Sequence, residues 1–175
     1  MESNKLSIVN FGAQKVPDFK EVRGKDWIQF GTEGEWKNRY PEYLLDLYRR
    51  SAKHHAIVNS KKDYVVGQGW TVESEGLTTF QLGKLEQFVR HPNQYEKLDD
   101  ILEKVALDYE LYNGFALEVV YDQLNEKIAA IYHADFARYR SNEDGTCYYY
   151  SEDWSKHNPE VEKIDAFNWQ NPEGK

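Results

Sequence analysis

Apolar residues recur at helical spacing in three stretches of the chain. Between Pro41 and Gly67 they repeat every three or four positions, which predicts one long helix or two short ones. A second helix is predicted over residues 78–91, and the clearest period of all runs from Leu98 to Tyr112, with aspartates in its first turn. The apolar stripes of these last two helices comprise Leu82, Leu85, Phe88, Val89, Leu98, Ile101, Leu102, Val105, Ala106, Tyr109 and Tyr112.

The period changes from helical to alternating after Asn113-Gly114, where the glycine is expected to take a left-handed conformation. Strands are predicted at Phe115–Tyr121 and Ile128–Tyr132, joined by a turn at 123–126. Each strand should place alternate residues on one face. These sets are Phe115, Leu117, Val119 and Tyr121 on the first strand, and Ile128, Ala130 and Tyr132 on the second.

A second strand pair is predicted at Phe136–Arg140 and Thr146–Tyr150, around the turn Ser141–Gly145. Trp70–Glu73 also alternates like a short strand after the glycines that stop the first helical stretch. The predicted fold is therefore α+β, with three or four helices followed by antiparallel β-hairpins.

The regions on either side of this pattern lack a clear period. Residues 1–40 mix short apolar clusters with glycines and are expected to form an extended arm with one or two short strands. The arm could pack on its own domain, residues 41–154, or on a neighbouring subunit. Residues 155–175 contain two prolines and few large apolar groups, so we expect an irregular tail that continues into a longer protein.

Charge is distributed unevenly along the chain. Residues 1–75 carry 12 Lys and Arg against 11 Asp and Glu, whereas residues 76–175 carry 10 against 19, which accounts for the net charge of −8. An acidic second half repels phosphate and argues against sequence-specific nucleic-acid binding. No apolar run approaches the roughly 20 residues of a membrane span. The single cysteine, Cys147, excludes an internal disulfide and a thiolate zinc cluster, and is typical of a protein made in a reducing cytoplasm.

Candidate catalytic and metal-binding motifs are weak. His54 lies off the apolar stripe and His55 on it, and neighbouring helical residues point about 100° apart, so the two are poor joint ligands. Gly67-Gln68-Gly69 follows a helix and precedes a strand, the reverse of a dinucleotide fingerprint. No serine lies in a Gly-x-Ser-x-Gly elbow. We expect no catalytic, cofactor-binding or metal-binding residue, and therefore no enzyme.

Aromatic and acidic residues gather in the segment 118–154 and leave two further functions open. A carbohydrate-binding module or glycosidase-like domain would use carboxylates beside aromatic rings. A generic cytoplasmic protein-interaction domain would use exposed aromatics, and Tyr148, Tyr150 and Trp154 are the candidate interface residues. The carboxylates considered are Glu118, Asp122, Asp135, Glu152 and Asp153, and a solvated acidic face over packed aromatics is their simplest interpretation.

The order of these elements resembles the N-terminal, wing-region portion of tailed-bacteriophage portal proteins. The likeness rests on Tyr43–Gly67, an early helix that ends at a glycine turn, and on Asp108–Asp122, a helix that ends in Tyr112-Asn113-Gly114-Phe115-Ala116 and leads into a strand with Glu118. Ile131–Arg140 is similar to the family's segment that leads from the hairpin into a strand with basic residues. Together these stretches lie within about residues 41–154.

The resemblance implies a structural role in the virion. Portal subunits form a ring, typically a dodecamer, at one capsid vertex, through which double-stranded DNA is packaged and ejected without sequence-specific binding. The ring docks the terminase during packaging and the head-tail connector afterwards. It implies no active site and no cofactor, and it implies assembly in the bacterial host cytoplasm into the capsid. The nucleic-acid-contacting residues cannot be assigned from the sequence.

Overall fold

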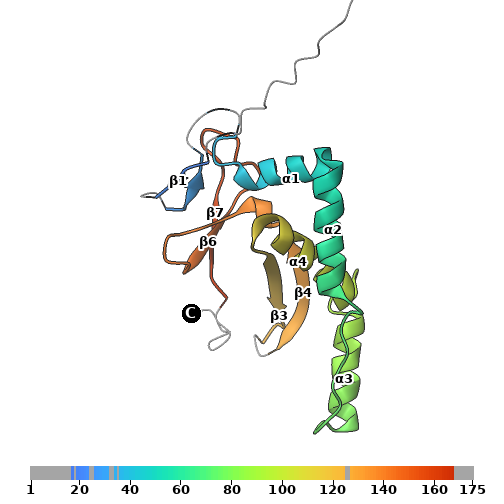
Figure 1. Ribbon diagram of the computed structural model, residues 1–175. Coiled ribbons are helices and arrows are strands. Elements are labelled where there is room, and N and C mark those ends of the chain that lie inside the picture. The colour runs from blue at the N-terminus through green and yellow to red at the C-terminus, as the bar shows by residue number, and fades with distance from the viewer. Residues whose placement is uncertain are drawn as a thin grey trace, which may run out of the picture.

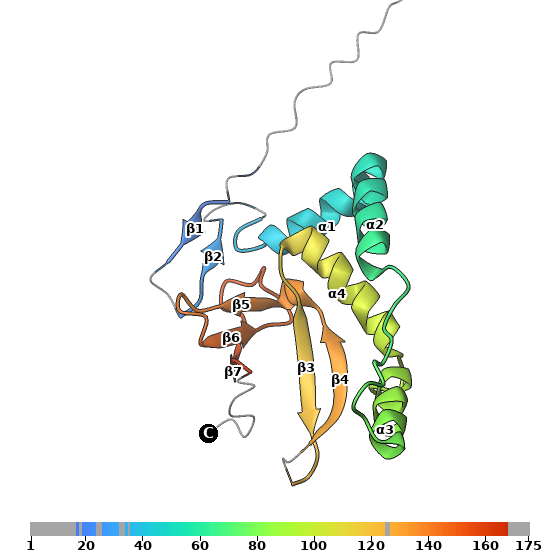
Figure 2. The ribbon, with the colours of Figure 1, turned by 60° about the horizontal axis from the view of Figure 1, so that its bottom comes forward.

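The structure is a computed structural model that describes residues 17, 19–23, 26–31, 34, 36–124 and 127–167. Four helices and several small antiparallel sheets make up this part of the chain, so the α+β prediction is confirmed. The helices lie along one flank and the three-stranded sheet on the other, with the β3–β4 hairpin between them (Figures 1 and 2). None of the described helices is both long enough and apolar enough to cross a membrane.

The first helical stretch is two helices, α1 (Tyr40–Arg50) and α2 (Ala52–Val66). They separate at Ser51, whose extended backbone ends α1 and whose hydroxyl accepts a hydrogen bond from the His54 N–H, 3.3 Å away, in the first turn of α2. This break turns the chain sharply, so that α2 runs across the end of α1 (Figure 1). The question that the sequence left open is thereby decided in favour of two helices.

Helices α3 (Thr79–Arg90) and α4 (Leu98–Tyr112) lie close to their predicted positions. A capping box between Thr78 and Gln81 starts α3. In α4, Ile101, Ala106 and Leu111 are buried, and this helix packs on the other three helices and on β4. The apolar core of the described residues therefore centres on α4.

Two of the predicted apolar positions on α3 and α4 are exposed instead, as are Phe115, Leu117 and Ile128 on the predicted strands. Tyr109 on α4 is 53% exposed, and Leu85 on α3 also faces solvent. At α4 the neighbouring Asp108 is buried, and its carboxylate lies 2.8 Å from the His133 Nε2 on β4, which compensates for the loss of water. The Asp108–His133 pair between α4 and β4 is thus part of the buried interior, although the apolar pattern of the sequence does not predict it.

The hairpin of β3 (Ala116–Tyr121) and β4 (Ile128–Ala134) is confirmed, with Leu117 opposite His133. A register shift between Val120 and Tyr121 places Ile128 opposite Tyr121. The prediction that Ile128 shares a face with Ala130 and Tyr132 is therefore wrong, because the irregularity interrupts the alternation. Part of the predicted turn, residues 125 and 126, lies outside the described residues.

The predicted strand at Phe136–Arg140 is only partly correct. Residues Phe136–Arg138 form a 3-10 turn, and β5 occupies Tyr139–Ser141. The turn forms because the Asp135 carboxylate accepts the Ala137 N–H at 3.1 Å and so caps it. The next strand, β6 (Cys147–Tyr150), pairs with β5 as expected.

Two other predictions fail on strand pairing. Trp70–Glu73 is not a strand, and the Trp70 N–H donates instead to the Asp99 Oδ1 at 2.8 Å. Conversely, the tail predicted to be irregular contributes β7 (Glu162–Asp165), which pairs with β6 to give the sheet β5-β6-β7. Residues 168–175 of that tail lie outside the described residues.

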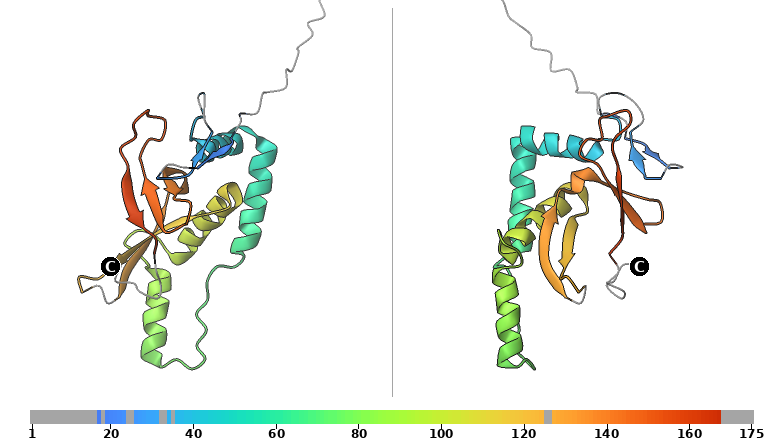
Figure 3. Two further views of the ribbon diagram at one scale, coloured as in Figure 1. Left: turned by 90° about the vertical axis from the view of Figure 1, so that its left-hand side faces the viewer. Right: turned by 180° about the vertical axis from the view of Figure 1, so that it is seen from behind.

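The N-terminal arm contains two short strands, β1 (Glu21–Val22) and β2 (Gln29–Phe30), as expected. Its described part packs on its own domain, since the Ile28 N–H donates to the Ser141 carbonyl of β5 at 2.9 Å. Figure 3 shows this strand pair beside the three-stranded sheet. Residues 1–16 of the arm lie outside the described residues.

Asn113, rather than Gly114, is the left-handed residue that ends α4, with φ of 58°. Gly114 is required for a different reason. A Cβ atom there would lie 2.8 Å from the Phe136 Cζ, and that ring is stacked on Tyr112 with its centroid 5.5 Å away. The close approach of the backbone to a packed ring therefore favours glycine.

Gly114→Ala is expected to lower the free energy of unfolding by about 1–3 kcal/mol, because the added methyl group overpacks the Tyr112–Phe136 stack. Gly83→Ala is the matched control. No atom lies within 4 Å of a Cβ at this position on α3, so alanine should raise the free energy of unfolding by about 0.5–1 kcal/mol. Chemical denaturation of both variants measures the difference, and equal effects would contradict the close approach at Gly114.

Candidate functional site

A buried arginine joins the N-terminal arm to the β-sheet. Arg140 on β5 is 3% exposed and donates from Nη1 to the carbonyls of Ala137 and Tyr139, at 2.7 and 2.8 Å. Its Nη2 donates to the Asn38 carbonyl at 2.7 Å and lies 3.5 Å from the Glu42 carboxylate on α1. One guanidinium thus connects the arm, α1 and β5.

The same burial shifts the pKa of both charged partners. Removal from water lowers the pKa of Arg140 to about 10, against the opposing effect of Glu42. Burial raises the pKa of Glu42 above its ordinary value, although the Arg140 charge lowers it. The guanidinium therefore remains cationic at neutral pH.

Trp154 belongs to this cluster and is only 4% exposed. Its indole Nε1 donates to the Arg138 carbonyl at 2.8 Å, the Arg140 guanidinium lies 4.8 Å from its ring centroid, and Trp27 packs edge-on at 5.4 Å. The prediction that Trp154 forms part of an exposed interface is therefore wrong. The irregular segment after β6 folds back and buries the ring under the arm.

The aromatic residues of β6 do alternate between the two sides of the sheet. Tyr149 packs against Trp27 of the arm, with ring centroids 5.4 Å apart. Tyr148 lies opposite Ile164 of β7, and both are exposed. Tyr150 is half-buried beside Tyr139. Tyr148 and Ile164, with the neighbouring acidic residues of segment 142–165, form what we call the sheet surface.

Helix α2 has apolar residues on both of its sides. Val58 is buried, whereas Ile57 is 60% exposed and Tyr64 is 89% exposed. Lys53, Ile57 and Tyr64 follow one another at spacings of four and seven residues, so they share one side of the helix. We call this side, together with the exposed Arg49 at the end of α1, the α2 surface.

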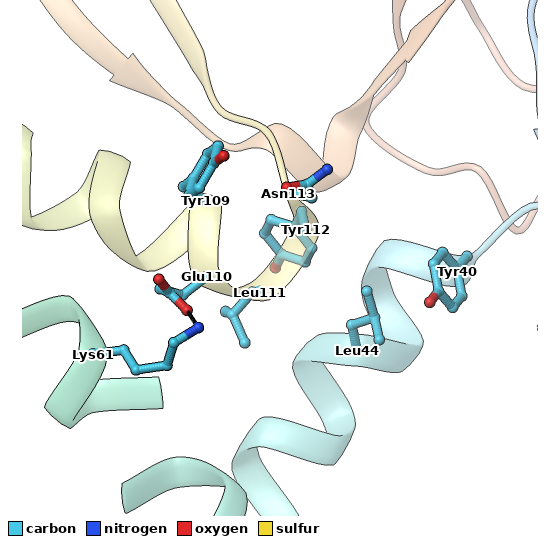
Figure 4. A pocket seen from close by; sticks show the side chains of 8 residues that line it. All are labelled: Tyr40, Leu44, Lys61, Tyr109, Glu110, Leu111, Tyr112 and Asn113. Atoms are coloured by element: carbon cyan, nitrogen blue, oxygen red, sulfur yellow. Dashed lines mark hydrogen bonds and ion pairs between the residues drawn. The ribbon is translucent and has the colours of Figure 1, made fainter. Parts of the chain in front are cut away.

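A pocket of roughly 400 Å³ opens between α1, α2 and α4 (Figure 4). The Lys61 ammonium and the Glu110 carboxylate form an ion pair in its wall. The pKa of the Tyr112 phenol, which also lines the pocket, is raised because the ring is buried, and nearby carboxylates add to the effect. The charges of Lys61 and Glu110 in the pocket wall therefore neutralise each other, and the Tyr112 phenol stays protonated at neutral pH.

The carboxylates proposed for carbohydrate chemistry are largely engaged in local structure. Asp135 caps the 3-10 turn, Asp153 accepts the Ser155 N–H at 2.9 Å, and Asp122 accepts the Lys127 N–H at 3.4 Å. Glu118 and Glu152 are exposed. With Trp154 buried, the aromatic surface for sugar stacking also loses its largest ring.

The histidines do not gather with two or more other potential metal ligands in the part of the chain that the structure describes. His54 is half-buried and His55 exposed, the reverse of the expected stripe, and the His55 ring stacks on Tyr48 at a centroid distance of 4.4 Å. Within the described ranges, no three His, Cys, Asp or Glu side chains converge so as to hold a metal ion.

Two features of the site were not predicted from the sequence. Arg140 contacts Asn38 from 102 positions away, and no local pattern marks such a contact. The α2 surface did leave a signal, because the adjacent pairs Ile57-Val58 and Val65-Val66 put apolar residues on both sides of a helix.

No protein-family model matches the chain, and no curated protein matches its sequence.

Proposed function

We propose that this chain is a structural subunit of a tailed-bacteriophage portal and corresponds to the wing region of that ring. One observation carries the proposal. Sixteen large apolar residues are exposed among the described residues, whereas seven hydrophobic residues and the prolines Pro41 and Pro92 are buried there. A surface of this kind is typical of a subunit that buries more apolar area by association.

The order of the elements supports a portal ring as the particular assembly. Helix α4 ends at the left-handed Asn113, and the chain then enters the β3–β4 hairpin, which carries Glu118. This is the helix, turn and hairpin order on which the resemblance to portal proteins rests. The polar interior supports a scaffold as well, since Arg140 serves to join three elements.

In this proposal the partners are other copies of the chain, which form the ring, and the terminase, capsid and head-tail connector proteins. Double-stranded DNA passes through the ring. An acidic protein that does not neutralise phosphates lets DNA slide, because each phosphate contact adds salt-dependent affinity. The subunit would be made in the host cytoplasm and would reside in the virion, with no catalytic residue and no cofactor.

Electron microscopy of the complete gene product tests this function. Closed rings with an axial channel are the expected result. A particle that remains monomeric at high concentration, or one that assembles without a channel, would contradict it. Binding of the complete gene product to a glycan array, lost on Glu118→Gln, would instead favour the carbohydrate-binding alternative. A specific protein partner without ring formation would favour the interaction domain.

A further inference from the structure

Two surfaces of opposite charge lie on opposite flanks of the molecule. The stretch Arg49–Lys62, at the end of α1 and along α2, contains five Lys and Arg, two His and no Asp or Glu. Segment 142–165, which contains β6 and β7, has seven Asp and Glu against two Lys. Helix α4 and the β3–β4 hairpin separate the two surfaces in both views (Figures 1 and 2).

Both surfaces also expose apolar side chains beside their charges. On the α2 surface these are Ile57 and Tyr64, with Lys53 on the same side of the helix. On the sheet surface Tyr148 and Ile164 are paired across β6 and β7, next to Glu162 of β7. Arg50, Lys61 and Lys62 are ion-paired with carboxylates, so Arg49 and Lys53 carry the positive charge of the α2 surface. Each surface therefore combines an apolar centre with charges that are mainly of one sign.

We propose that the α2 surface of one copy binds the sheet surface of a second copy, head to tail. This inference rests on the proposed function and names the two surfaces through which the ring would form. Position and charge together select this arrangement. Because the two surfaces lie on opposite flanks, a two-fold contact centred on either one would bring α2 against α2, or sheet against sheet, and so place like charges together. A head-to-tail contact pairs basic with acidic at every interface and leaves one surface of each kind free for the next copy.

Charge reversal on one surface at a time tests the pairing. The first variant is Arg49→Glu with Lys53→Glu, and the second is Glu160→Lys with Glu162→Lys; all four side chains are exposed. We expect the unaltered chain to self-associate in sedimentation velocity at low salt, and to dissociate as salt rises. Each variant alone should associate at least about tenfold more weakly.

Mixing the two variants is the decisive measurement. The reversed α2 surface of the first is then complementary to the reversed sheet surface of the second, and the unaltered surfaces also match. Association should return in the mixture to near the level of the unaltered chain. Lys127→Glu, at the exposed tip of the β3–β4 hairpin, is the control and should associate as the unaltered chain does.

Three results would overturn the inference. The variants could associate as well as the unaltered chain, the mixture could fail to recover, or the unaltered chain could remain monomeric at all concentrations and salts. If the complete gene product still forms channelled rings, the proposed function stands and only these surfaces are wrong. If it forms no ring, the proposed function fails as well.

Discussion

Replacing Arg140 with methionine is expected to lower the free energy of unfolding by about 3–5 kcal/mol, the range found when one partner of a buried polar cluster is removed. Methionine fills much of the same space but donates no hydrogen bond. The carbonyls of Asn38, Ala137 and Tyr139 and the Glu42 carboxylate would then lose their donor in a region from which water is largely excluded. Denaturation by urea, followed by circular dichroism, measures the loss.

Arg138→Met is the matched control for this prediction. Arg138 lies two positions away, its side chain is 45% exposed, and it pairs with Asp135 at 3.3 Å on the surface. Its replacement should change the free energy of unfolding by no more than about 1 kcal/mol. Losses of similar size in the two variants would show that Arg140 does not hold the cluster together.

Arg140→Met should also loosen the arm from the domain. Arg140 links the Asn38 carbonyl and side chain to β5, so its loss should speed proteolytic cleavage between residues 19 and 38. Cleavage rates that match those of Arg138→Met would contradict this role. Cleavage of the arm should also be faster than in Ile101→Ala, a variant in α4 that loses a similar free energy of unfolding, and this comparison separates anchoring of the arm from a general loss of stability.

The elements that the sequence predicts best are those whose pattern is repeated within the element itself. Helix α4 combines fifteen residues of apolar period with aspartates in its first turn and an Asn-Gly ending, so its bounds follow from local information. The same is true of the β3–β4 hairpin. Trp70–Glu73 and β7 show the opposite case, because a strand exists only where a partner offers a free edge. Glu162–Asp165 has one large apolar residue, yet it pairs with β6.

The functional surfaces were predictable in part. Alternation along Tyr148, Tyr149 and Tyr150 correctly implied one aromatic face toward the domain and another away from it. Trp154 could not be placed in this way, because it follows the strand and its position depends on the fold-back beneath Trp27. Arg140 is a residue whose contacts come from distant parts of the chain, and its charge suggests the surface rather than the interior.

Ile101→Ala and Ile57→Ala are expected to differ in effect although the chemical change is the same. Ile101 on α4 is 2% exposed, so its truncation removes buried apolar contacts and leaves a cavity, which should lower the free energy of unfolding by about 2–5 kcal/mol. Ile57 on α2 is largely exposed, so its truncation should change that free energy by no more than about 0.5 kcal/mol.

Self-association should respond in the opposite order. Ile57→Ala removes an apolar group from the centre of the α2 surface and should weaken association severalfold while the monomer stays folded. Ile101→Ala, assayed in a range where the variant is still folded, should associate as the unaltered chain does, because its side chain lies inside the subunit. Sedimentation velocity beside urea denaturation gives both quantities for each variant. A large loss of stability with Ile57→Ala would show that α2 packs that side chain within its own subunit, and the α2 surface would then be wrong.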